Sequence, residues 1–132
     1  DGGAVFNDKG TMVMRTCTFD GNHASFSGGA VFNFRGTMAV HDCTFTDCSA
    51  ERRGGAISVN AGVMTIRSSA LMDNRAGEMG GGINTMQSVL TLQATLLTDN
   101  VAPVGATLNL GVNTTAQYLL PAPPGHWVPA TR

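Results

Sequence analysis

The sequence repeats itself every 26 residues. Glycine-rich motifs GGAV, GGAV, GGAI and GGGI begin at Gly2, Gly28, Gly54 and Gly80. The same spacing aligns apolar columns, among them Met12, Met38, Met64 and Leu90, and Phe19, Phe45, Leu71 and Leu97. A fixed period of this length is the signature of stacked repeat architectures, in which each unit contacts its neighbours. The length of 132 residues fits one such domain.

Each unit is built from short strands. Apolar columns alternate with other residues, as in Thr11 to Arg15, which is the period of two expected of a strand with one buried face. One unit has no partner for that face, so units must stack to close a core. The pattern predicts an all-β, right-handed parallel β-helix over residues 1–116. It has about four 26-residue coils, a partial fifth, and about three strands per coil.

Two further columns mark the turns between strands. Paired glycines at 2–3, 28–29, 54–55 and 80–81 indicate corners that need a positive φ or a close backbone approach. Asn22, Cys48, Asn74 and Asn100 share one position. Asparagine tolerates the left-handed conformation and forms amide ladders when stacked, so we interpret this column as a turn device.

Composition and charge exclude several classes of partner. Charged residues make up 13% of the chain, the net charge is −1, and neither sign forms a run, which predicts no nucleic-acid partner. No apolar stretch approaches the roughly 20 residues of a membrane-spanning helix, so we expect no direct membrane insertion. Nothing in the sequence calls for a cofactor.

The outward columns of one strand form a candidate partner face. They are Thr11, Thr37, Val63 and Val89, and next to them Val13, Ala39, Thr65 and Thr91. A flat, uncharged patch favours a protein contact, although threonine and valine also have simple strand propensity. Threonine arrays occur in ice-binding solenoids too, but with a stricter Thr-x-Thr repeat. Phe6 and Phe32 share a column that strict alternation turns outward, where they would extend the partner surface.

The motif GGA[VI], paired with F-x-x-N at Phe19 to Asn22 and its variants in later coils, resembles a known repeat. It is similar to the repeats of chlamydial polymorphic outer membrane proteins and related pectate-lyase-like β-helix surface proteins, over roughly residues 1 to 104. The resemblance implies a β-helix used in adhesion or surface display. It favours an extracellular, cell-surface or organelle-lumen location over the cytosol, without fixing which.

Asp47, Asp73 and Asp99 form a column beside the turn asparagines, about 4.8 Å apart. Such a row is a candidate for Ca²⁺ binding or for acid–base catalysis of the kind that polysaccharide-cleaving β-helices use. No Lys or Arg column lies in the same or an adjacent frame. A solvated turn position is therefore the favoured interpretation.

Cys17 and Cys43 share an inward column on adjacent coils. A disulfide between them is a candidate, and two buried reduced thiols are an equally satisfactory alternative. Cys48 remains unpaired in both cases. The three cysteines and the histidines do not have the spacing of a zinc site.

The last residues, 117–132, are predicted to form an extended, proline-rich arm that caps the last coil or docks on a partner. Its apolar anchors are Tyr118, Leu119, Leu120, Trp127 and Val128. At the other end, the first coil exposes unpaired strand edges. We expect a protein partner, or the remainder of the same polypeptide, to abut the chain at Asp1.

The sequence thus predicts a non-enzymatic structural or interaction β-solenoid, a fragment or subunit of a larger protein or assembly. Its mechanism is geometric, because stacked coils hold the outward columns in register. An adhesin-type surface module is the first alternative. A carbohydrate-active lyase or hydrolase built on the aspartate row is the second.

Overall fold

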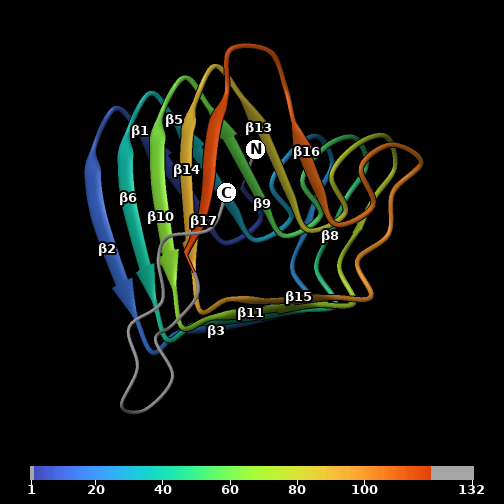
Figure 1. Cartoon of the computed structure of the whole chain (residues 1–132). Helices are drawn as coiled ribbons and strands as arrows, with labels where there is room; N and C mark the ends of the chain where they lie inside the picture. The colour runs from blue at the N-terminus through green and yellow to red at the C-terminus, as the bar shows by residue number, and fades with distance from the viewer. Residues whose placement is uncertain (1, 120–132) are drawn as a thin grey trace.

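The computed structural model describes residues 2–119 and shows a parallel β-solenoid. Strands of successive coils pair in parallel and build four sheets, which we name A to D. In Figure 1, sheet B lies at the left, sheet C closes the bottom, and sheet A runs from the top toward the right. No helix in this part of the chain is long and apolar enough to cross a membrane. The predicted β-solenoid is confirmed.

The strands follow the same order in each coil. Sheet A contains β1 (Val5–Asp8), β5 (Val31–Phe34), β9 (Ile57–Asn60), β13 (Ile83–Met86) and β16 (Leu108–Leu110). Sheet B contains β2 (Thr11–Arg15), β6 (Thr37–His41), β10 (Val63–Arg67), β14 (Val89–Gln93) and β17 (Thr115–Leu119). Sheet C contains β3 (Thr18–Asp20), β7 (Thr44–Thr46), β11 (Ala70–Met72) and β15 (Leu96–Thr98). Sheet D contains β4 (His23–Ala24), β8 (Ser49–Ala50) and β12 (Arg75–Ala76).

The core consists of the predicted apolar columns. Met38 pairs in register with Met12 on one side and Met64 on the other, and the side chains of Met38 and Met64 are buried. The rings of Phe19 and Phe45 stack with centroids 4.7 Å apart and planes 5° from parallel. Each coil therefore buries side chains against the identical position of the next coil, which a single coil cannot do.

Each of the first three coils has four strands where the alternation predicts about three. The additional strands are the two-residue segments of sheet D, and they follow the turn column that contains Cys48 and Asn74. Two residues are too short to display a period of two, so sequence alternation has no signal there. The pairing partner on the next coil, as in His23 with Ser49, creates this sheet.

At the corner before sheet A, the two glycines of each pair are required for different reasons. The first glycine of each pair has a positive φ, 68° at Gly28 and 66° at Gly54. The second has no room for a side chain, since a Cβ on Gly55 would collide with the backbone oxygens of Gly81 and Arg75. Both predicted reasons for glycine are confirmed, each at its own position.

Between the fourth and fifth coils, the spacing of paired residues shortens from 26 to 25 and then returns to 26. Met79 forms a bridge with Val104, and Ile83 pairs with Leu108, each 25 residues further along the chain. The spacing returns to 26 in β17, where Val89 pairs with Thr115. The predicted boundary at 116/117 therefore falls inside β17, and the solenoid continues to Leu119. The rest of the predicted arm, including Leu120, Trp127 and Val128, lies outside the described residues.

Candidate functional site

The outer side of sheet B carries the predicted partner face. Val13, Val63 and Val89 are 54%, 41% and 45% exposed. The face consists of two in-register columns that β17 extends to a fifth strand: Thr11, Thr37, Val63, Val89 and Thr115, and Val13, Ala39, Thr65, Thr91 and Gln117. We call these ten residues the sheet B face.

No ionisable side chain belongs to the sheet B face. Ionisable side chains occur in the column that borders it. The bordering column contains Arg15, His41 and Arg67 at the strand ends. Five parallel strands hold the ten side chains in fixed rows, about 4.8 Å apart from coil to coil. This geometry can present a flat, uncharged surface, and it offers no convergent group for chemistry.

The outer side of sheet A is different, because its central column changes along the solenoid. Phe6 and Phe32 stack with ring centroids 5.5 Å apart, as their shared column predicted, and Phe6 is 48% exposed. The next positions in register are Ser58 and Asn84, whose side chains are buried. The aromatic stack thus ends at Ser58, and the space that a third ring would fill stays open.

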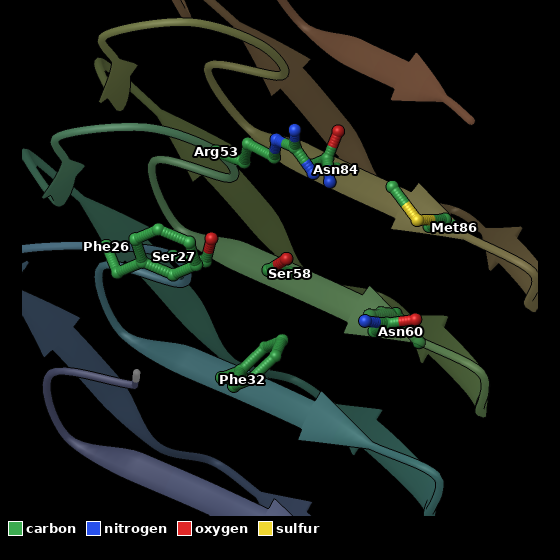
Figure 2. A pocket seen from close by; sticks show the side chains of 9 residues that line it. Phe26, Ser27, Phe32, Arg53, Ser58, Asn60, Asn84 and Met86 are labelled. Atoms are coloured by element: carbon green, nitrogen blue, oxygen red, sulfur yellow. The ribbon is translucent and has the colours of Figure 1, made fainter.

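That space is a pocket of about 60 Å³, which we call the Ser58 pocket. Figure 2 shows Ser58 at its centre, with Phe32 below and the Arg53 side chain beside Asn84. Its lining also includes Phe26, Ser27, Val59, Asn60 and Met86. The sequence prediction missed this site. The signal was present in the column Phe, Phe, Ser, Asn, which departs from the repeat where the pocket opens.

The aspartate column forms turns. Asp47, Asp73 and Asp99 are exposed and have φ of 54°, 58° and 55°, and the first coil has Gly21 at the same position. Asp is one of the residues that tolerate this left-handed conformation. Within residues 2–119, no group of three or more His, Cys, Asp and Glu side chains is arranged to hold a metal ion. The favoured turn interpretation accounts for the column without a ligand.

The candidate disulfide is absent, because the structure contains Cys17 and Cys43 as free thiols. Each Sγ instead donates to a carbonyl oxygen two residues earlier, Cys17 to Arg15 at 3.3 Å and Cys43 to His41 at 3.2 Å. In-register side chains on adjacent coils run parallel about 4.8 Å apart, whereas a disulfide needs Cβ atoms roughly 3.5–4.5 Å apart. Burial raises the pKa of the Cys43 thiol, and it does the same for Cys48.

Two of the turn asparagines, Asn74 and Asn100, form the amide ladder that their column predicted, and both are buried inside the solenoid. The Asn74 amide donates to Asn100 Oδ1 at 2.9 Å and to the Phe45 carbonyl at 3.1 Å. Its own Oδ1 accepts from the backbone N–H of Cys48 at 2.9 Å. A second ladder, from Asn7 to Asn33 at 2.9 Å, was not predicted. Both ladders fix corners of the scaffold that carries the outer faces.

Of the predicted docking arm, the structure describes two anchors, and both belong to β17. Tyr118 extends the column of Leu92, and its hydroxyl donates to the Thr95 carbonyl at 2.8 Å. Leu119 is the last described residue and pairs with Gln93. These two side chains therefore help to complete the fifth coil.

Comparison with known proteins connects a short segment, where the first coil passes into the second, to a known repeat. Residues 16–33 match the Chlamydia polymorphic membrane protein (Chlamydia_PMP) repeat. No curated protein and no solved structure matches the chain. The match confirms the resemblance stated on GGA[VI] and F-x-x-N for that repeat, and the likeness to pectate-lyase-like surface proteins stays a prediction. Together, the repeat and the β-solenoid fit a surface or structural repeat module.

Proposed function

We propose that this chain is a non-enzymatic β-solenoid module that presents the sheet B face to a protein partner. The observation that carries the proposal is the combination of flatness, exposure and absence of charge over five paired strands. Side chains in stacked strands have few rotamers left to lose, so a partner binds them at a low entropic cost. Exposed apolar patches of this kind are typical of contact surfaces.

The proposed location is a cell surface, where the module would act in adhesion or display. The match of residues 16–33 to the polymorphic membrane protein repeat supports this location. A covalently continuous solenoid suits it, because every coil is held by backbone hydrogen bonds to its neighbours, as from Gly28 N to Arg53 O at 3.0 Å. Such a rod keeps its shape while it projects a binding face.

The first coil is the second proposed contact. β1, β2, β3 and β4 each lie at the end of their sheet, so the described part of the chain leaves one edge of all four sheets unpaired. Unpaired edges recruit further strands. We expect the remainder of the same polypeptide, or a partner chain, to pair there.

The sheet B face is tested by placing charge on it. The double variant Val63→Glu with Val89→Glu puts two carboxylates in adjacent rows at the centre of the face. Leu96→Glu is the matched control, since Leu96 is a 55% exposed apolar residue on the outer side of sheet C. Wild type and both variants are purified from the native source, and the proteins that accompany each are quantified by mass spectrometry.

We expect the double variant to lose a protein that the wild type and Leu96→Glu both retain, by about tenfold or more, because buried like charges at an interface cost several kcal/mol. Circular dichroism must show that all three chains keep the same strand content. Retention of every accompanying protein by the double variant would remove the sheet B face as the partner surface.

A further inference from the structure

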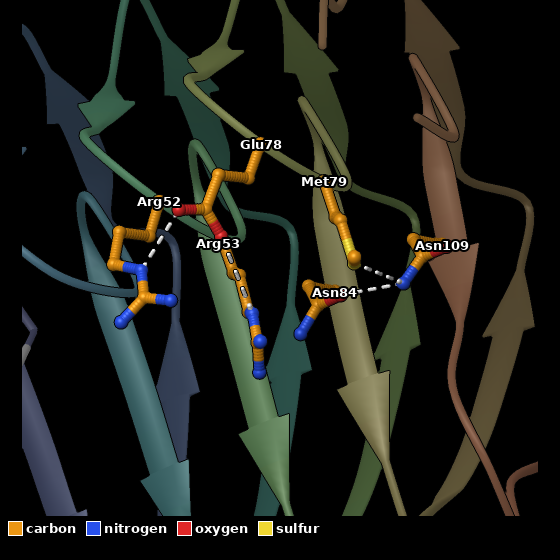
Figure 3. Close-up of polar contacts among 6 residues, drawn as sticks. All are labelled: Arg52, Arg53, Glu78, Met79, Asn84 and Asn109. Atoms are coloured by element: carbon orange, nitrogen blue, oxygen red, sulfur yellow. Dashed lines mark hydrogen bonds and ion pairs between the residues drawn. The ribbon is translucent and has the colours of Figure 1, made fainter. Parts of the chain in front are cut away.

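An arginine beside the Ser58 pocket lacks a full set of partners. Figure 3 shows Arg52 and Arg53 on either side of Glu78. Arg52 Nε donates to Glu78 Oε2 at 2.9 Å, and the Arg52 guanidinium also lies over the Phe26 ring at 4.7 Å. Arg53 Nε is 3.9 Å from Glu78 Oε1, which is beyond hydrogen-bond distance. The Glu78 carboxylate thus lies near two guanidinium groups, and it is hydrogen-bonded to the one of Arg52.

Arg53 Nε is buried and has no hydrogen-bond partner among the residues that the structure describes. A buried donor without a partner costs free energy, more so when its group is charged. The side chain as a whole is 31% exposed, so an incoming group can reach the guanidinium. The guanidinium of Arg53 therefore brings positive charge to the lining of the Ser58 pocket.

The polar lining of the pocket suits a carboxylate. The hydroxyls of Ser27 and Ser58 and the amides of Asn60 and Asn84 all contain donors. A guanidinium with several neutral donors is the usual protein environment of a bound carboxylate. No acidic side chain lines the pocket. Among the described acidic side chains, only Glu78 contacts Arg53, and its carboxylate is already paired with Arg52.

The pocket is too small for a whole ligand. About 60 Å³ accommodates a carboxyl group and little more, so the remainder of the occupant must lie across the surface outside. That surface is apolar and aromatic, with Phe6 and Phe26 exposed and Phe34 6.3 Å from Phe32 by ring centroids. Aromatic side chains with arginine are the residues enriched in protein–protein contacts.

We propose that the Ser58 pocket binds the carboxylate of an acidic side chain on a partner protein, with Arg53 as its charge partner. The apolar neighbours of that acidic residue pack on the phenylalanines around the pocket. This site lies on sheet A and does not depend on the sheet B face or on its partner. The charge of Arg53 supplies recognition of the carboxylate, and the end of the aromatic stack at Ser58 supplies the space.

A peptide titration of the full chain, followed by NMR, tests this assignment. The probe is acetyl-leucyl-glutamyl-leucine amide, compared with its glutamine analogue and with galacturonate. The Nε–H signal of Arg53 and the backbone signals of Ser58 and Asn84 report binding. Arg53→Gln removes the charge, and Ser58→Phe fills the pocket by continuing the stack of Phe6 and Phe32. Arg67→Gln, on an exposed arginine at the border of sheet B, is the matched control.

We expect the glutamyl peptide to shift these signals saturably. The glutamine analogue and Arg53→Gln should each weaken binding by about tenfold or more, Ser58→Phe should abolish it, and Arg67→Gln should leave it unchanged. Equal binding of the two peptides, or unchanged binding by a folded Arg53→Gln chain, would overturn the proposal. Binding of galacturonate without the peptide would overturn the protein partner as the source of the carboxylate.

Discussion

At the residue scale, buried amides distinguish this solenoid from a purely apolar stack. Asn33 and Asn74 have no exposed surface, and their side chains bond to backbone groups of neighbouring coils. Asn74 accepts from the N–H of Cys48, which lies at the corner between β7 and β8, and it donates to the carbonyl of Phe45 in β7. Buried backbone groups need such partners.

Replacement of Asn74 by leucine should destabilise the chain by about 1–3 kcal/mol, because it leaves the Cys48 N–H buried without its partner and removes the hydrogen bond to the Phe45 carbonyl. Urea denaturation measures the change in the free energy of unfolding. Asn22→Leu is the matched control at the end of the same column, where a neighbouring coil is described on one side only, and it should cost less. Equal losses in the two variants would contradict the structural role of the ladder.

The sequence predicted the residues that repeat and missed those that depart from the repeat. The column of Asn74 recurs in three coils, so its ladder was predictable. The ladder of Asn7 and Asn33 ends at Val59, and two members do not establish a column. The Ser58 pocket escaped prediction for the same reason, because it exists where one column changes residue type and an arginine from a loop lies over it.

At the scale of elements, the corner before sheet A sets how closely coils stack. The second glycine of each pair, Gly29 or Gly55, brings its backbone against a carbonyl of the next coil. The αL turn after sheet C has no such contact, since a Cβ on Gly21 meets nothing within 4 Å. The first corner therefore requires glycine for space, whereas the second requires only a residue that tolerates a positive φ.

Gly55→Ala should destabilise the solenoid by about 3 kcal/mol or more, because the new methyl group collides with backbone oxygens that cannot move independently. Gly21→Asp is the control. The other coils have Asp at that position with φ between 54° and 58°, so this change should stay within about 0.5 kcal/mol. Thermal unfolding of both variants measures the difference. An unchanged melting temperature of the Gly55→Ala variant would contradict the close backbone contacts at this corner.

The elements themselves divide into predictable and unpredictable strands. β2, β6, β10 and β14 have five residues with clear alternation and were predictable from the columns. β17 has the same pairing, but Thr115 to Leu119 match the columns only in part, so the sequence predicts solenoid for its first two residues and arm for the last three. The strands of sheet D have two residues each and are defined by their partners rather than by their own pattern.

At the scale of the molecule, stacking of identical positions is both the source of stability and the basis of the proposed function. The columns that face inward form one continuous core along the solenoid, from Met14 to Leu92. The columns that face outward are held at the same spacing and in the same order. The sheet B face and the Ser58 pocket therefore depend on one register of 26 residues.

Methyl NMR of the methionines tests that register directly. Met12, Met38 and Met64 occupy one column, so their methyl groups should lie one coil apart, about 5 Å for neighbours and about 10 Å for the outer pair. In a chain labelled at the methionine methyl groups, we predict NOEs from Met38 to both Met12 and Met64, and none between Met12 and Met64. The absence of both Met38 NOEs, or a strong NOE between Met12 and Met64, would contradict the stacked solenoid.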